Sequence, residues 1–162
     1  MAGEAISSSI LLIGAAVGAA FLIAAILPAI FSAGDTFGAV SKSAENKMTT
    51  DFRIINTYAS VSPSANVTVW MKNVGANRLS IYDIQKSDIF YGVNNAQVTD
   101  LSYPDGFGYG LTDTTNNGYW DVGETLQVSV KSPGTINNGD PIYFSFTTPN
   151  GVRRLTTFST NI

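Results

Sequence analysis

The stretch EAISSSILLIGAAVGAAFLIAAILPAIFSAG, residues Glu4 to Gly34, decides the N-terminal part of the fold. It has no charged side chain from Ala5 to Gly34, and nothing in it alternates with a period of two. A helix needs about 20 apolar residues to cross about 30 Å of hydrocarbon, and Ile6 to Phe31 meets this requirement. Because it is apolar on every face, it is not an ordinary amphipathic surface helix. The stretch therefore predicts a helix that spans a membrane, packs against copies of itself, or does both.

A cleaved secretory signal is the first alternative for this segment. Such a signal has a basic n-region, a shorter apolar core and a small-residue cleavage site. Here the first charged side chain is Glu4, an acid, and the apolar run is longer than a signal requires. We therefore expect the segment to remain in the working protein.

Small residues recur within the apolar run at the GAAVG motif. Gly14 and Gly18 are four residues apart and are flanked by Ala15 and Ala19. Small residues at this spacing let two helix backbones approach closely, which predicts a helix–helix contact. The alternative is that Gly is simply common in membrane-spanning helices, and the sequence leaves both readings open.

The helical pattern continues beyond Pro28, which we expect to bend the helix because it removes one backbone donor. Apolar residues follow at mixed three- and four-residue steps, with charged residues between them. The apolar positions are Phe31, Phe37, Val40, Ala44 and Met48, and the charged ones are Asp35, Lys42, Glu45 and Lys47. We expect an N-terminal helical domain over residues 1–49 and a second domain over residues 50–162.

Charge does not decide which side of a membrane the second domain faces. Lys42 and Lys47 lie just after the span, and the positive-inside rule would therefore place the second domain in the cytoplasm. The sequon NVT makes Asn66 a candidate N-glycosylation site, which favours the outside. The Asn-, Thr- and Gly-rich, charge-poor text of the second domain is also typical of surface proteins, so we expect it outside the cell.

Residues 50–162 read as short strands separated by turns. Alternating or β-rich runs are DFRIINTYASV, NVTVWMKN, RLSIYDI, SDIFYGV, AQVTDLSY, ETLQVSVKS, PIYFSFTT and VRRLTTFS, and the turns include SPSA, NVGAN, PDGFGYG, NNGD and PNG. The Asn-Gly at Asn150 and Gly151 predicts a hairpin between the last two strands. About eight such strands favour an all-β antiparallel sandwich with no helix of useful length.

One loop, DTTNNGYWDVGE, resembles the calcium pattern D-x-[DN]-x-[DN]-G-x5-E. Oxygens at alternating positions around a turn that glycine permits can converge on one hard cation. The candidate ligands are Asp113, Thr115, Asn117, the Tyr119 carbonyl, Asp121 and Glu124. Thr115 departs from the pattern, and no flanking helices are expected, so the loop is not an EF-hand. The alternative is a polar turn with Trp120 in the core; if calcium binds, it does so with modest affinity.

Composition excludes several classes of function. The chain has no Cys and no His, which removes disulfides, thiol chemistry and most nucleophilic triads. Its net charge of −3 and the lack of a basic stripe argue against nucleic acid as a partner. A carboxylate pair among Asp113, Asp121 and Glu124 is the one arrangement that invites glycoside chemistry, and no cleft-forming insert accompanies it. We therefore expect no enzymatic activity.

Several segments in a fixed order resemble one known family. They are DFRIIN, VTVWMKNVGANRL, DIFYG, VGETLQVSV, NNGDPIYFSF and TPNGVRRLTTF, and they follow the SSSILLIGAAV helix. The chain is thereby similar to the FlaG/FlaF family of archaeal flagellar (archaellum) accessory proteins, over nearly its whole length. Lys72-Asn73-Val74-Gly75 and the terminal NGV…F are the most specific parts of this resemblance.

The resemblance implies an external β-sandwich, immunoglobulin-like or archaellin-like, on a membrane helix. It implies a non-enzymatic stator or accessory protein of the motility machinery that self-associates and contacts the S-layer or other archaellum proteins. The alternative is a filament subunit, an archaellin or type IV pilin-like protein, whose helix packs in a filament core. Such subunits normally carry a basic leader, and this sequence shows none, so the accessory protein is the first expectation.

Overall fold

The computed structural model describes residues 2–61, 65–94, 98–131 and 134–160. It divides into two compact units, residues 1–44 and 45–162. Helix α1, Ala2–Thr49, supplies the whole first unit and ends inside the second.

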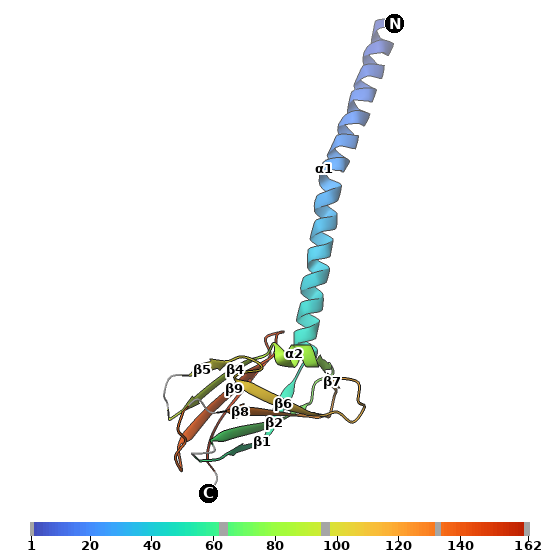
Figure 1. The fold of residues 1–162 in the computed structure, drawn as a ribbon. Helices are drawn as coiled ribbons and strands as arrows, with labels where there is room; N and C mark the ends of the chain where they lie inside the picture. The colour runs from blue at the N-terminus through green and yellow to red at the C-terminus, as the bar shows by residue number, and fades with distance from the viewer. Residues whose placement is uncertain (1, 62–64, 95–97, 132–133, 161–162) are drawn as a thin grey trace. The chain divides into compact units, whose positions relative to one another are not determined.

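Helix α1 is 48 residues long and runs without a break through Pro28 (Figure 1). At about 1.5 Å per residue it is about 70 Å long. Residues 3–48 are all exposed in the single chain, including the apolar stretch. The predicted long N-terminal helix is confirmed, and its apolar surface has no partner within the described chain.

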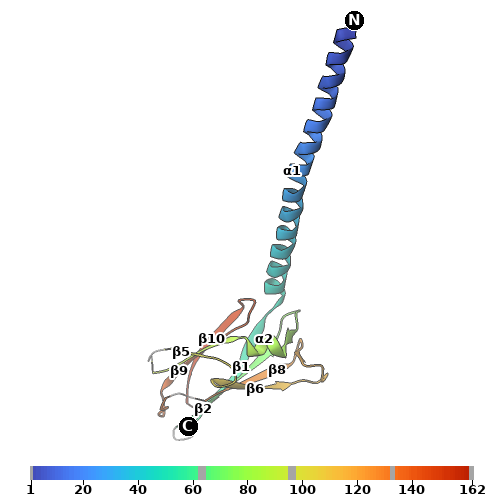
Figure 2. The ribbon, with the colours of Figure 1, turned by 45° about the horizontal axis from the view of Figure 1, so that its top comes forward.

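The second unit is an antiparallel β-sandwich, as predicted. Its strands are β1 (Phe52–Ala59), β2 (Asn66–Asn73), β3 (Leu79–Ser80), β4 (Asp88–Val93), β5 (Thr99–Leu101), β6 (Phe107–Thr112), β7 (Tyr119–Trp120), β8 (Thr125–Lys131), β9 (Pro141–Thr147) and β10 (Arg153–Ser159). Sheet 1 has the order β1-β2-β8-β6 and sheet 2 the order β10-β9-β4-β5, while β3 pairs with β7. The strands of sheet 1 and those of sheet 2 group separately in both ribbon views (Figures 1 and 2).

The core lies between the two sheets because alternate side chains of each strand point inward. Strand β2 shows this clearly: Val67, Val69 and Met71 are fully buried, and the residues between them are not. Phe52 packs on Trp120 and on Phe146, with ring centroids 5.8 and 5.4 Å apart. These aromatic rings lie next to the start of β1, directly after the helix.

Two segments depart from the sequence prediction. RLSIYDI was expected to be a strand, but it divides into β3 and the short helix α2, Ile81–Gln85. Ser80 caps α2, because its side chain accepts a hydrogen bond from the Asp83 amide while the Asp83 carboxylate accepts one from the Ser80 amide. PDGFGYG was expected to be a turn, but its last four residues open strand β6.

The predicted terminal hairpin is confirmed. Strands β9 and β10 pair antiparallel across the Pro149–Gly151 turn. Gly151 has φ of +81°, a left-handed conformation that glycine adopts without steric cost. The turn chemistry therefore explains why the last two strands are neighbours.

Candidate functional site

The middle of α1 carries the small residues that predicted a helix–helix contact. Gly14, Ala15, Gly18 and Ala19 are all exposed. A Cβ atom added at Gly14 or Gly18 meets nothing within 4 Å in the described chain. Their small size is therefore not required by contacts within the chain, and contact with a second helix stays a prediction. By length and composition, α1 is the one helix of the described residues that could cross a membrane.

Beyond the uncharged stretch, one side of α1 remains apolar. We call Phe37, Val40, Ala44 and Met48 the apolar stripe. Steps of three and four residues keep these side chains on one helix face, since each residue turns the helix by about 100°. Phe37, Val40 and Met48 are 77%, 62% and 86% exposed. Asp35 and Lys42 lie about opposite this stripe, whereas Lys47 is seven residues after Val40 and lies beside it. This part of the helix is therefore amphipathic as far as about Ala44.

The last turn of α1, residues 45–49, is bonded into the second unit. We call this turn together with Thr50 and Asp51 the helix foot. The Thr49 carbonyl accepts hydrogen bonds from the amides of Ala76 and Asn77 at 2.8 and 3.1 Å. The Asp51 carbonyl accepts from Val74 and Gly75 at 3.0 and 2.8 Å. The loop after β2 thus supplies the donors that the carbonyls at a helix C-terminus lack.

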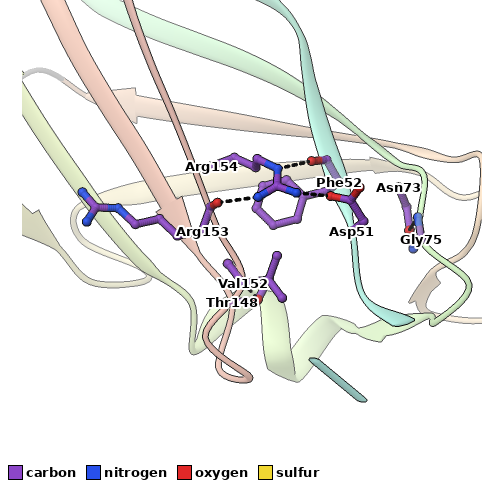
Figure 3. Close-up of polar contacts among 8 residues, drawn as sticks. All are labelled: Asp51, Phe52, Asn73, Gly75, Thr148, Val152, Arg153 and Arg154. Carbon is purple, nitrogen blue, oxygen red and sulfur yellow. Dashed lines mark hydrogen bonds and ion pairs between the residues drawn. The ribbon is translucent and has the colours of Figure 1, made fainter. Parts of the chain in front are cut away.

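Asn73 and Gly75 shape that loop, which we call the collar, residues 73–77. Asn73 is fully buried, and its side-chain amide donates to the carbonyls of Asn77 and Trp120, both at 2.9 Å. Its Oδ1 accepts from the Gly75 amide at 3.1 Å (Figure 3). A Cβ at Gly75 would lie 2.4 Å from the Asp51 nitrogen and 2.6 Å from the Thr49 oxygen. Only glycine fits at this approach.

The terminal hairpin and β10 bond to the other side of the foot. The Asn150 side chain donates to Thr50 Oγ1 at 2.8 Å and to the Asn46 carbonyl at 3.4 Å. Arg154 forms an ion pair with Asp51 and donates to the Phe52 carbonyl at 3.2 Å (Figure 3). Two segments far apart in sequence, the collar and the last hairpin, therefore hold the foot.

The acidic loop is organised by hydrogen bonds to its own carboxylates. Asp113 accepts from the amides of Thr115, Asn117 and Gly118. The Gly118 amide in particular lowers the pKa of Asp113 below its ordinary value. Glu124 accepts from the hydroxyl and amide of Thr114, and the hydroxyl lowers the pKa of Glu124. This network gives the loop a polar-turn architecture.

The remaining predicted ligands join the same network. Asp121 accepts from the side chains of Thr115 and Asn117 at 3.1 and 2.7 Å. The Trp120 indole is fully buried and donates to the Glu124 carbonyl at 2.9 Å, as the turn alternative expected. Within the described residues, no three carboxylates are placed to hold a metal ion. Calcium binding at this loop stays a prediction.

The glycosylation candidate Asn66 is the first residue of β2, and it is exposed. Its backbone bonds to Ser60 across the β1–β2 connection. The exposed Asn66 side chain is accessible to modification, and glycosylation of Asn66 also stays a prediction.

A model of the archaeal-type flagellin family matches residues 2–158, which include both the helix and the sandwich. The chain belongs to the archaeal-type flagellin family. A relative from Archaeoglobus fulgidus, described as an uncharacterized protein, is 36% identical over 167 residues, covering 98% of this chain and 99% of the relative.

Three solved structures share the fold of this flagellin-family chain. The archaeal flagellum of Methanospirillum hungatei strain JF1 matches 96% of this chain and 93% of its own, with 20% identity and a TM-score of 0.75. The archaellum periplasmic stator protein FlaG of Sulfolobus acidocaldarius matches 67% of this chain and 99% of its own, with 22% identity and a TM-score of 0.53. Its complex of FlaF and FlaG matches 69% of this chain and 91% of its own, with 23% identity and a TM-score of 0.52.

These likenesses confirm the resemblance to archaellum proteins and the helix-plus-sandwich fold. The chain is an archaellum-related structural protein, and both the stator and the filament are represented among proteins of its fold. The proteins that it resembles are structural components rather than enzymes.

Proposed function

We propose that this flagellin-family chain is a membrane-anchored accessory component of the archaellum, of the stator type, with its β-sandwich outside the membrane. The observation that carries the proposal is where charge begins along α1. Residues 5–34 are uncharged, and Asp35 is the first of several charged residues in the next turns. About 45 Å of uncharged helix is enough to cross a hydrocarbon core of about 30 Å, with tilt absorbing the excess.

We further propose that the protein self-associates through α1. The apolar stripe lies beyond the uncharged stretch, where the opposite face of the helix is charged and suits water. An apolar face on such a helix is stabilised when another helix covers it. A second copy presents the same stripe, and the small residues at Gly14 and Gly18 permit close contact further along. In this proposal the sandwich contacts the S-layer or other archaellum proteins.

A filament subunit is the second candidate. The flagellin model and the fold likeness to the Methanospirillum hungatei flagellum both include the helix as well as the sandwich. In a filament, the apolar stretch would be buried by neighbouring helices instead of lipid. Self-association through the stripe is common to both candidates, so it does not discriminate between them.

Shearing cells that make the protein distinguishes the candidates. A membrane-anchored accessory protein stays with the membrane fraction when surface fibres are sheared off, and detergent then releases it. Recovery of the chain as the main component of the sheared fibres would replace the stator proposal with the filament. An antibody to the sandwich, applied to intact cells, tests whether that domain is outside.

Cysteine cross-linking tests self-association, and the absence of native cysteine makes single substitutions clean. Val40→Cys lies on the apolar stripe, whereas Ala39→Cys is turned by about 100° toward the charged side. We expect oxidation in membranes to produce covalent dimers with Val40→Cys and few with Ala39→Cys. Equal cross-linking of the two variants, or none, would contradict packing through the stripe.

A further inference from the structure

The outward face of sheet 1 carries a row of side chains with mixed properties. On this face, Trp70 of β2 lies between Asn56 of β1 and Gln127 of β8, which are its register partners. Gln127 in turn is opposite Gly110 of the edge strand β6. An aromatic ring is thus flanked by two amide side chains and, beyond them, by a residue with no side chain.

The next row repeats this arrangement. Tyr58 is opposite Thr68, Thr68 is opposite Ser129, and Ser129 is opposite Gly108. Tyr58 is 47% exposed, and a Cβ placed at Gly108 meets nothing within 4 Å. The two rows form a shallow surface of aromatic rings and small hydrogen-bonding groups, open on the β6 side.

The third row is positively charged. Arg53 lies directly opposite Lys72, whose partner on β8 is Thr125. Lys131 is opposite Asn66 at the other end of the sheet and is not part of this row. None of the four strands of sheet 1 contains Asp or Glu, although the whole chain has a net charge of −3. Like charges opposite each other destabilise a strand pair. Neither Arg53 nor Lys72 forms an ion pair within the described residues, and both are exposed, so both are available to an anion from outside.

Trp70 contributes a partly exposed indole side chain to this face. Its side chain is half-buried, and its indole N–H has no hydrogen-bond partner among the described residues. A tryptophan side chain has an apolar body and one polar donor, which suits a ligand with one apolar face and a polar rim. A sugar ring has this construction, since its C–H groups form a face and its hydroxyls lie around the edge.

We propose that the outward face of sheet 1 binds an acidic polysaccharide that is external to the protein. The sugar rings stack on Trp70 and Tyr58, and their hydroxyls bond to the side chains of Asn56 and Gln127. Carboxylate or sulfate groups pair with Arg53 and Lys72. Gly108 and Gly110 leave space for the chain to pass over the edge strand. The proposal does not depend on how the helices assemble.

An acidic protein surface could also pair with Arg53 and Lys72, but it would not explain the aromatic and amide side chains on the same face. Hydroxyl and amide side chains both donate and accept, as sugar hydroxyls do. Gly108 and Gly110 also leave the β6 side of this face without protruding side chains. The arrangement therefore favours a polysaccharide, and an acidic protein is an outcome that the experiment must separate.

The experiment uses the full-length chain in detergent micelles, produced in a host that does not glycosylate it. The probes are an oligogalacturonate of defined length, its methyl ester, and polyglutamate of similar length. We expect the oligogalacturonate to bind and the ester to bind about tenfold more weakly, because esterification removes the charge but keeps the rings. Polyglutamate binding as tightly as the oligogalacturonate would overturn the proposal in favour of an acidic protein.

Single variants locate the site. Trp70→Ala and Lys72→Gln should each weaken oligogalacturonate binding about tenfold, and Trp70→Phe should retain most of it because a stacking ring remains. Lys86→Gln removes the same charge at the end of α2, outside sheet 1, and should leave binding unchanged. Each variant is compared at a temperature where its melting curve shows it folded. No binding by the native chain, or equal losses in Lys72→Gln and Lys86→Gln, would overturn the proposal.

Discussion

At the residue scale, Gly75 occupies a position where the backbone leaves no room for a side chain. The collar amides reach the carbonyls of Thr49 and Asp51 only because no side chain separates the two backbones there. Both atoms that a Cβ would meet first belong to the backbone, so they cannot rotate away as a side chain would. This one residue therefore determines how closely the collar and the helix foot approach.

Replacing Gly75 by alanine should destabilise the sandwich by about 1–3 kcal/mol, the usual cost of forcing extra atoms into a packed site. Urea unfolding of the full-length chain in detergent, followed by the fluorescence of its two tryptophans, measures this cost. Gly108→Ala is the matched control, because its Cβ enters open space on β6. Equal stability of the two variants would show that the collar shifts without cost.

Protonation of Asp113 should loosen the acidic loop. Its folded pKa lies below the ordinary value of 3.8, mainly because the Gly118 amide donates to it. The contribution of this carboxylate to stability is therefore present above the unfolded pKa and is lost as pH falls through the lower folded pKa. We expect the Gly118 amide proton signal to move only below about pH 4, and to stop titrating in Asp113→Asn. Movement at higher pH would contradict this assignment.

Calcium should raise the melting temperature if the acidic loop binds it. With affinity in the range of extracellular modules, about 10⁻⁴–10⁻³ M, millimolar calcium stabilises by about 1 kcal/mol. Differential scanning calorimetry with calcium and then with chelator measures the shift, and Asp121→Asn should abolish it. An unchanged melting temperature would contradict calcium binding at this loop.

Some of these functional residues could be predicted from the sequence, and others could not. The acidic loop could be found because its oxygens alternate around Gly118, but the amides that occupy them could not be foreseen. The role of Asn73 and Gly75 was missed, although an Asn two residues before a Gly is a signal for an Asx-turn. Their partners, Thr49, Asp51 and Trp120, come from distant segments, and one sequence does not show which segments meet.

At the element scale, the two errors of assignment have different physical causes. Apolar spacing in RLSIYDI fits a strand, but the reciprocal bonds between Ser80 and Asp83 start a helix there. In β6, the sequence predicted a turn because of Gly108 and Gly110. Those glycines instead occupy the outward positions of an edge strand, while Phe107 faces the core. Glycine in a strand marks a surface that something else can approach.

The α1 helix should associate less well when its small residues are enlarged. Gly14→Leu places a branched side chain where close helix packing needs none, so we expect weaker dimerisation by about tenfold in a membrane energy-transfer assay. The sandwich should melt at the native temperature, because Gly14 contacts nothing else in the described chain. Val17→Leu is the control, because it replaces one large apolar side chain by another and leaves Gly14 and Gly18 unchanged. Unchanged association in Gly14→Leu would leave the composition of an ordinary spanning helix as the explanation.

At the scale of the whole molecule, the two units differ in the solvent that suits them. The sandwich buries its large side chains between two sheets, whereas Leu11, Phe21 and Phe31 of α1 are 73%, 73% and 65% exposed. The long helix and the antiparallel sandwich were both predictable, since uncharged length and alternation are properties of the sequence itself. Strand order was not, because it depends on which distant strands pair.

The intact chain should therefore be dispersed only by lipid or detergent. We expect a single small species in detergent by analytical ultracentrifugation, and large assemblies or precipitate when the detergent is removed. Burying the apolar face of α1 accounts for this behaviour, since about 25 cal/mol is gained for each Å² removed from water. A stable, soluble monomer without detergent would contradict both the stator and the filament proposals.

The helix foot also has a mechanical consequence. Any load that arrives along α1 passes through Thr49, where the chain turns from rod to sheet. The collar bonds to the helix foot near this point, and so do Asn150 and Arg154 of the terminal hairpin. Force along α1 is therefore divided between the strand pair β1–β2 and the strand pair β9–β10. Under the stator proposal, this shared attachment would let the sandwich resist force transmitted along α1, because several hydrogen bonds and an ion pair would have to break together.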